Sequence, residues 1–354
     1  MSWFGTRGRS PIGLDAQGRY INAVQLTGSP RRWRIDAATS VARVDPAMPL
    51  EAEELTRLTT MLHRQGFHGR DVVLAVPSGR LLTGEFEMPV GATAGVRQAK
   101  ARARLASVHK CLPQDLESEC WDIPKPARAD GQSSVLAVAC KHDEADDLIN
   151  LFESAGLCVR ALDVESWAAA RASAPVVGDR ADLIPVLNLG WTAAVLVVVH
   201  DGIVVYERTL TEHGMNRLYG KLIAKLDMDC DVADHVLHEI GLQSDDSEAG
   251  EHSEVLAVVR SYITSHLDRL IGELSTSLSY ASQEYPDREL DRLLVHGEGA
   301  LVPDLVQRLG DQLDLATRTL VPTDIAHCGG PLAGLGGSPA LITALGLAQH
   351  RVAA

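Results

Sequence analysis

Polar and apolar positions form two similar β-hairpin patterns, one near the N-terminus and one near the middle of the chain. In IGLDAQGRYINAVQL, residues 12–26, two apolar runs flank a polar turn with an acid and a glycine. The stretch IPVLNLGWTAAVLVVVHDG, residues 184–202, repeats strand, glycine turn and strand. Asp15 and Asn188 occupy matching places, about half the chain length apart. The spacing predicts an internal duplication of an α/β unit that begins with a hairpin.

The remaining pattern supplies the strands and helices that complete each half. Apolar periodicity predicts a helix over 50–65, a buried strand over 71–78, and a strand, helix and strand over 135–166. In the second half it predicts helices from about 214 to 242 and through Tyr285, separated by a polar loop. A strand, a glycine turn and a helix follow, and a glycine-rich loop leads into a closing helix. The chain is therefore expected to be an α/β protein.

Composition limits the class of protein and its partners. The chain has 354 residues, 45% of them hydrophobic and 23% charged, which suits two or three folded domains. Its formal net charge of −14 repels phosphate backbones, so we expect no nucleic acid partner. Six scattered cysteines without a C-x-x-C pair indicate reduced thiols. No apolar run has the form of a signal peptide or approaches the ~20 residues of a membrane span. We expect a cytoplasmic protein whose association with a membrane is peripheral or depends on a partner.

Four stretches, in their order along the chain, resemble a known family. They are IGLDAQGRYINAVQL, VVLAVPSGRLLTGEFEMP, VLAVACKHDEADDLINLFESAGLCVRALDVES and LDRLIGELSTSLSYASQEYPDRELDRLLVHGEGALVPDL, with LITALGLAQ near the end. Together they span most of the chain. In them the sequence resembles the PilM family of type IV pilus assembly proteins, which is itself similar to the cell-division protein FtsA.

This resemblance implies an actin-like fold, which is a duplicated α/β (ribonuclease H-like) architecture whose two halves face a cleft. It also implies a small inserted β-α-β domain of the SHS2 type. The implied divisions are 10–84 and 163–182 for the first actin-like subdomain, 85–162 for the insertion, 183–213 and 288–354 for the second actin-like subdomain, and 214–287 for a helical subdomain of the second half.

The resemblance also implies a nucleotide site at the turns. In actin-like ATPases the acid and glycine turn of each hairpin serves a phosphate, because glycine lets backbone N–H groups approach the oxygens and the acid holds magnesium. Here the residues in the corresponding places are Asp15, Gly18, Arg19, Asn188, Gly190, Thr192, Gly297 and Gly299.

Several residues depart from the implied nucleotide pattern. Gln17 stands where a glycine is expected in the first turn, and Trp191 where a hydroxyl is expected in the second. Asn188 brings no charge to magnesium, and Glu298 places a carboxylate between two glycines. We therefore expect no enzyme, but a degenerate cleft without ATP hydrolysis whose glycines serve tight turns. Bound ATP with magnesium stays open as the alternative.

For partners, the resemblance implies a groove, lined by the first subdomain and the insertion, that takes the cytoplasmic tail of an inner-membrane protein, PilN. The chain would then be a scaffold of a type IV pilus or type II secretion platform, coupled to a cytoplasmic motor ATPase ring. Candidate partner-binding residues in the matching region are Leu82, Phe86, Met88, Arg97, Lys100 and Arg104. The three basic residues also suit an ordinary solvated helix face.

Two other functions stay open. An actin-fold ATP-dependent phosphotransferase or kinase would need intact phosphate turns and an acid near a substrate hydroxyl. An FtsA-like cell-division protein would be expected to carry a C-terminal amphipathic membrane helix, whereas this chain ends in ALGLAQHRVAA. His235 and His238 lie at helical spacing but lack further ligands, so we expect no metal site.

Overall fold

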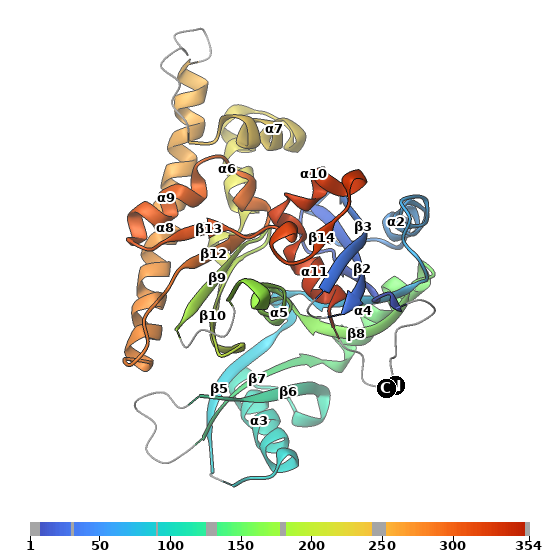
Figure 1. Ribbon diagram of the computed structural model, residues 1–354, viewed down its shortest axis with the longest axis vertical. Coiled ribbons are helices and arrows are strands. Elements are labelled where there is room, and N and C mark those ends of the chain that lie inside the picture. Colours follow the sequence, from blue (N-terminus) through green and yellow to red (C-terminus); the bar gives the residue numbers. More distant parts are fainter. Residues whose placement is uncertain are drawn as a thin grey trace.

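Two β-sheets lie at the centre of the two halves of the molecule, and their strands follow the same order except that the first has an additional edge strand, β14 (His327–Cys328) (Figure 1). The computed structural model describes residues 8–29, 32–89, 91–124, 133–177, 182–242 and 253–350. The first sheet contains, in spatial order, β14 (His327–Cys328), β3 (Arg32–Ala42), β2 (Tyr20–Ser29), β1 (Ile12–Asp15), β4 (Asp71–Val76) and β8 (Cys158–Val164). The second contains β11 (Ile203–Leu210), β10 (Ala194–His200), β9 (Ile184–Leu189), β12 (Leu293–His296) and β13 (Thr317–Thr319).

The two sheets share one pattern of strand pairing. In each sheet three neighbouring strands pair antiparallel, in the order β3, β2, β1 or β11, β10, β9. The last of these, β1 or β9, is the central strand and pairs in parallel with β4 or β12. The central strands are rich in branched apolar residues, and every residue of β9 is buried. This shared order agrees with the predicted duplication, and it brings the carboxyl ends of β1 and β9 to the same region between the halves.

Two helices with small side chains lie between the sheets. They are α5 (Glu165–Val177) and α11 (Ile342–Ala348), and their buried residues share one core with both sheets. Their approach is close, because a Cβ on Gly13 would collide with the α11 backbone and a Cβ on Gly346 with the α5 backbone. The small residues therefore allow both halves to pack on one shared layer.

The outer face of each sheet is covered by longer amphipathic helices. On the first sheet these are α2 (Ala52–Arg64) and α4 (His142–Ser154), and on the second α6 (Met215–Leu226), α7 (Cys230–Ile240), α8 (Ser253–Glu284) and α9 (Leu305–Leu313). Shorter turns are η1 (Ser78–Arg80), η2 (Pro113–Asp115), η3 (Thr211–His213), η4 (Glu298–Leu301), η5 (Pro322–Asp324), η6 (Gly330–Leu332), η7 (Pro339–Leu341) and α10 (Ala333–Gly336). Among the described helices, none combines the length and the apolar character needed to cross a bilayer.

A separate three-stranded sheet projects from the first half (Figure 1). It has the order β5 (Leu82–Met88), β7 (Ser133–Lys141), β6 (Leu116–Ile123), and α3 (Ala94–His109) covers one face. The predicted insertion, 85–162, also includes α4 and β8, but β8 pairs with β4 in the first sheet. Strand pairing therefore favours 82–141 as the bounds of this inserted unit. The boundary was difficult to predict because β7 runs into α4 without a break.

Side chains fix the inserted unit to the rest of the molecule. Trp121 on β6 stacks on Trp167 of α5, with ring centroids 4.1 Å apart. The Tyr285 hydroxyl donates to the Pro124 carbonyl at 3.1 Å. Ile123 is buried in the core that the two large sheets share. The inserted unit is thus packed directly against the helix that begins at the cleft.

Candidate functional site

The cleft between the halves closes around a small cavity of about 30 Å³, the volume of one water molecule. It is lined by Asp15, Gln17, Gly18, Asn22, Glu165, Asn188, Gly190, Trp191, Thr192, Ala193, Gly297, Glu298, Ala340 and Thr343. The predicted nucleotide residues that the structure brings together there are Asp15, Gly18, Asn188, Gly190, Thr192 and Gly297. Arg19 and Gly299 do not line it, and Gly299 instead packs against Leu189 and Met215.

Two carboxyl groups and an amide meet at the floor of the cavity. Asp15 ends β1 and accepts a hydrogen bond from the Gln17 backbone N–H at 3.2 Å. Glu165, the first residue of α5, accepts one from the Asn188 side chain. Burial raises the pKa of Asp15, and burial together with the charge of Asp15 raises the pKa of Glu165. The two carboxyl groups therefore resist being ionised together.

Glu165 was not among the residues predicted from the sequence. A signal was available, because an acidic residue directly follows β8, a parallel strand of the first sheet, and opens the next helix. Residues at the carboxyl ends of parallel strands line the cleft in α/β folds. Its approach to Asn188, which lies on a strand of the other half, depends on how α5 packs between the sheets.

Glu298 enters the cavity from the other half and faces the first turn. Its carboxylate accepts a hydrogen bond from the backbone N–H of Tyr20 at 3.2 Å. A Cβ on Gly18 would require the Glu298 carboxylate to shift. Removal from water raises the pKa of Glu298 to about 7. The charges of Asp15 and Asp234 act in the same direction, and hydrogen bonding from the backbone of the first turn opposes them.

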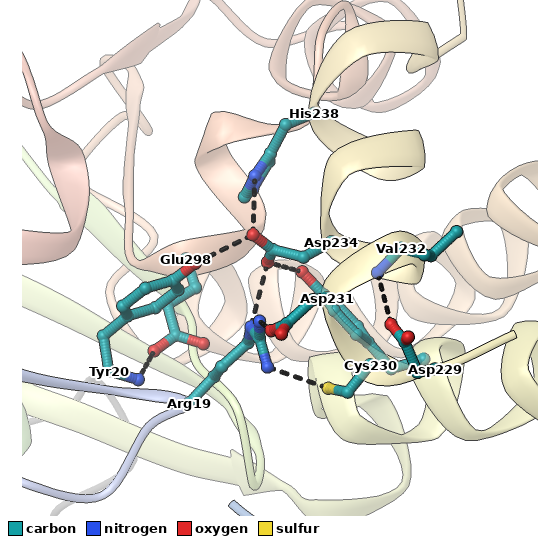
Figure 2. A network of polar contacts seen from close by, with 10 residues as sticks. Arg19, Tyr20, Asp229, Cys230, Asp231, Val232, Asp234, His238 and Glu298 are labelled. Atoms are coloured by element: carbon teal, nitrogen blue, oxygen red, sulfur yellow. Dashed lines mark hydrogen bonds and ion pairs between the residues drawn. The ribbon is translucent and has the colours of Figure 1, made fainter. Parts of the chain in front are cut away.

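Arg19 turns away from the cavity and contacts α7 (Figure 2). Its guanidinium lies 3.2 Å from Asp234 and 2.5 Å from Asp231, and it donates to the Cys230 sulfur at 2.9 Å. The Arg19 side chain is 4% exposed. The prediction that Arg19 contributes to a phosphate site is therefore wrong for this structure, since its charge is already paired with carboxylates of the second half.

Asp234 is the centre of this contact between the halves (Figure 2). It accepts hydrogen bonds from the hydroxyls of Tyr20 at 2.8 Å and Tyr219 at 2.6 Å. His238 lies 3.6 Å from it, one helical turn along α7. Although burial opposes this, the hydrogen bonds from His238 and the two tyrosines hold the pKa of Asp234 below its usual range. Asp234 is therefore ionised near neutral pH.

The second turn packs into its own half. The carbonyls of Gly190 and Trp191 accept the backbone N–H groups of Met215 and Asn216 at the start of α6, both at 2.9 Å. The Trp191 ring is buried and meets Tyr219 edge to face, with centroids 4.9 Å apart. Trp191 therefore fills a core position, and Thr192 beside it is exposed.

The residues of the cleft do not fit a nucleoside triphosphate. The cavity measures about 30 Å³, and three carboxyl groups, Asp15, Glu165 and Glu298, line it. Two buried amide oxygens, those of Asn22 and Asn188, also line it and have no donor among the described residues. The Gln17 side-chain nitrogen is a buried donor without a partner among these residues. The lining thus offers more acceptors than donors where phosphate oxygens would need donors.

The predicted partner-binding residues lie on the inserted unit, where they divide into two groups. Leu82, Phe86 and Met88 pack in the core of that unit, where Met88 is 1% exposed and the other two are partly buried. Met88 is therefore a core residue, and a role of Leu82 and Phe86 in partner binding stays a prediction. Arg97 pairs with Asp122 at 3.3 Å. Lys100 and Arg104 are exposed on α3, and their role stays a prediction.

An apolar groove of about 540 Å³ lies on the first half, where β1 and β4 end. The loop between β3 and α2, the helix α4 and the segment that leads into the inserted unit form its walls. Its lining residues are Leu14, Ala16, Gln17, Arg43, Pro46, Ala47, Met48, Pro49, Leu50, Leu74, Ala75, Pro77, Ser78, Gly79, Arg80, Leu148, Leu151, Phe152, Thr192 and Thr211. The candidate partner-binding residues predicted from the sequence do not line this groove, because residues of six separate segments form it, and two of these segments, at Thr192 and Thr211, belong to the second half.

Comparison with known proteins identifies the family. A family model described as "Type IV pilus assembly protein PilM" matches residues 13–352. The chain belongs to the PilM family. Its fold is similar to that in the solved structure "PilM-PilN type IV pilus biogenesis complex", with a TM-score of 0.77 and 18% identity over 96% of this chain and 97% of that chain. It also resembles the ethanolamine utilization protein EutJ from Carboxydothermus hydrogenoformans, with a TM-score of 0.51 and 14% identity over 96% and 89% of the two chains.

Membership of the PilM family agrees with the architecture. The fold is of the actin-like class that the sequence predicted, with two related halves around a cleft. In this chain both turns at the cleft contact other residues of the protein. The first turn contacts Glu298 and α7, and the second contacts the start of α6.

Proposed function

We propose that this PilM-family chain is a cytoplasmic scaffold of a type IV pilus or type II secretion inner-membrane platform. It would dock the cytoplasmic tail of a PilN-like membrane protein and so connect the platform to a motor ATPase ring. Membership of the family over residues 13–352 supports the pilus assignment. The fold similarity to a PilM-PilN complex agrees with a docking role. The protein would lie at the inner membrane only through this contact.

The observation that carries the docking proposal is the apolar groove on the first half. Its long wall consists of Leu148, Leu151 and Phe152 on α4, and Met48 lies opposite in the loop before α2. Met48 is 57% exposed, although it is large and apolar. A short tail that inserts apolar side chains here would remove this surface from water, and such anchors dominate the affinity of peptide grooves.

Charge at the groove would set the orientation of the tail. Arg43 and Arg80 are the basic residues that line it. Arg43 is 9% exposed and already lies 3.5 Å from Glu54, whereas Arg80 is exposed. An acidic or carbonyl group on the tail would therefore meet Arg80 first. Exposed charges contribute more to association rate and register than to affinity.

A binding measurement with the partner's tail tests this proposal. A labelled peptide of the PilN-like tail should bind the protein, and Leu148→Asp should weaken binding by about tenfold or more, because it places a charge on the apolar wall. The matched variant Arg97→Glu with Arg104→Glu tests the basic face of α3. Equal affinity of the wild type and Leu148→Asp would reject the groove, and loss only in the arginine variant would place the tail on the inserted unit.

We further propose that the chain does not hydrolyse ATP and has no ATP with magnesium bound. Asn188 provides no charge for magnesium, and Gln17 and Trp191 replace the glycine and hydroxyl of phosphate turns. Magnesium-dependent turnover that Asp15→Ala abolishes would contradict this and favour the phosphotransferase alternative.

Recovery of the protein in the membrane fraction should require the PilN-like partner.

A further inference from the structure

The first turn of the cleft already has an acceptor bound to it, and this acceptor is a carboxyl group of the chain itself. The backbone N–H of Tyr20 donates to the Glu298 carboxyl group at 3.2 Å. Backbone N–H groups at a glycine-containing turn are the usual ligands of a phosphate. A carboxyl group offers this donor an oxygen acceptor, as a phosphate would.

We propose that Glu298 is an internal ligand that occupies the phosphate position of the first turn, and that Arg19 and Tyr20 hold the cleft closed over it by contacts with α7. The chain would thereby keep the closed arrangement of its two halves without a nucleotide. This inference concerns the cleft and does not depend on the docking groove proposed above.

The contact joins the two halves and is not a local turn. Glu298 follows β12 of the second sheet, and Tyr20 begins β2 of the first sheet, 278 positions earlier in the chain. Figure 2 shows that the Glu298 carboxylate and the Tyr20 backbone face each other from opposite sides of the cleft. Opening the halves would therefore break this hydrogen bond and expose the Tyr20 N–H of the turn.

Arg19 and Tyr20 add a second set of contacts from the same turn. The Arg19 guanidinium and the Tyr20 hydroxyl both reach Asp234 on α7 (Figure 2). These residues lie 215 and 214 positions apart from Asp234 in the chain. The turn is consequently held by its backbone to Glu298 and by its side chains to α7.

Gly18 lies directly against the Glu298 carboxylate. A Cβ of residue 18 would meet a carboxylate oxygen, so the flexible end of the Glu298 side chain would have to shift. Gly18 does not have a positive φ, so its backbone conformation does not require glycine. Glycine at this position leaves room for the carboxylate beside the turn, as it would for a phosphate.

Amide hydrogen exchange tests whether Glu298 holds the turn. In the E298A variant, the amide of Tyr20 should exchange at least about tenfold faster than in the wild type, because its acceptor is lost. The matched control E273A removes a carboxylate of α8 that pairs with Arg208 of β11 at 2.5 Å, and it should leave this amide unchanged. The E298Q variant keeps a carbonyl acceptor of the same shape and should show intermediate exchange.

Nucleotide titration tests whether Glu298 excludes an anion. Wild-type protein and E273A should bind Mg-ATPγS with a Kd above about 1 mM, whereas E298A should bind at least about tenfold more tightly. E298Q should stay near the wild type, since its amide fills the same space. Unchanged amide exchange at the first turn in E298A would overturn the proposal. So would an equal affinity of the wild type and E298A for Mg-ATPγS.

Docking of the PilN-like tail provides an independent readout. Gln17 and Thr192 line both the cavity and the groove, but Glu298 lines only the cavity. E298A can therefore change exchange at the first turn while the tail still binds. Loss of tail binding in Leu148→Asp without a change in turn exchange would likewise concern only the groove. The two proposals can therefore fail separately.

Discussion

The two hairpin turns at the cleft occupy equivalent places in the two halves but are built in opposite ways. The first turn makes polar contacts with the other half, through Tyr20 to Asp234 at 2.8 Å and through its backbone to Glu298. The second turn packs inside its own half, where Trp191 is 7% exposed and lies against Tyr219. One repeated element has thus become a polar link between the halves, and the other a corner of an apolar core.

This difference shows that equivalent turns of the two halves can be stabilised in two ways. The second turn makes apolar contacts within its own half. The first turn makes polar contacts that join the halves and depend on the charges of its groups. The contrast predicts that changes at the second turn lower stability, whereas changes at the first turn alter the closure of the cleft.

The largest effect is expected for Trp191→Ala at the second turn. It removes a buried indole that contacts Tyr219, and such substitutions typically lower the free energy of unfolding by about 3–5 kcal/mol. Urea denaturation monitored by circular dichroism measures this loss. The neighbouring Thr192→Ala, at an exposed residue, should change the free energy by less than about 0.5 kcal/mol. A small effect of Trp191→Ala would mean that the second turn is not part of the core.

At the first turn, Arg19→Met should lower the free energy of unfolding by about 2 kcal/mol. The substitution keeps an apolar side chain but removes the charge that pairs with Asp234, which is 14% exposed. The loss should stay below that of Trp191→Ala because Tyr20, Tyr219 and His238 still donate to Asp234.

Asp231→Asn is the matched control for Arg19→Met. Asp231 also pairs with Arg19, but its side chain is 89% exposed, so the loss should be less than about 0.5 kcal/mol. Both variants can be compared by denaturation at low and high salt. If Asp231→Asn lowers the free energy of unfolding as much as Arg19→Met does, the buried contact with Asp234 does not account for the effect of Arg19→Met.

The fold could be predicted from the sequence further than the site could. Apolar runs predicted both hairpins, because most residues of their strands are buried. The alternation of apolar and polar residues over Leu82–Met88 did not show which neighbour covers that strand, so its core face was interpreted as a partner surface. The end of the inserted unit was misplaced because β7 continues directly into α4.

At the cleft, sequence reasoning found the turns but not what binds to them. Asp15 and Asn188 could be placed because each ends a strand of a repeated hairpin. The pairing of Arg19 with Asp234 could not, since the two residues are 215 positions apart and α7 alone has the pattern of a solvated helix. Glu298 was identified as unfavourable to a nucleotide, but only the tertiary structure places its carboxylate on the first turn.

A pH effect separates Glu165 from the contacts of the first turn. Burial and the charge of Asp15 raise the pKa of Glu165 above its unfolded value. Its contribution to stability is therefore fully present below about pH 4.3 and is lost as pH rises through the folded pKa. Between pH 5 and pH 8 the free energy of unfolding should fall by on the order of 1 kcal/mol less in Glu165→Gln than in the wild type.

Urea denaturation at both pH values measures this difference for Glu165→Gln. The glutamine can still accept the hydrogen bond from Asn188, so a structural loss should be small. Glu273→Gln, at an exposed carboxylate on α8, should keep the pH dependence of the wild type. An identical pH dependence in wild type and Glu165→Gln would show that Glu165 ionises freely in the folded protein.

The smallest effect, and the sharpest comparison, comes from two tyrosines that share one carboxylate. Tyr20 on the first half and Tyr219 on the second donate to different oxygens of Asp234, at 2.8 and 2.6 Å. Tyr20→Phe and Tyr219→Phe should each lower the free energy of unfolding by about 1 kcal/mol, because each removes one hydrogen bond. Only Tyr20→Phe removes a bond between the halves, so only it should speed amide exchange at both the first turn and the start of α7. Equal exchange in the two variants would show that Asp234 stabilises α7 alone and does not hold the cleft closed.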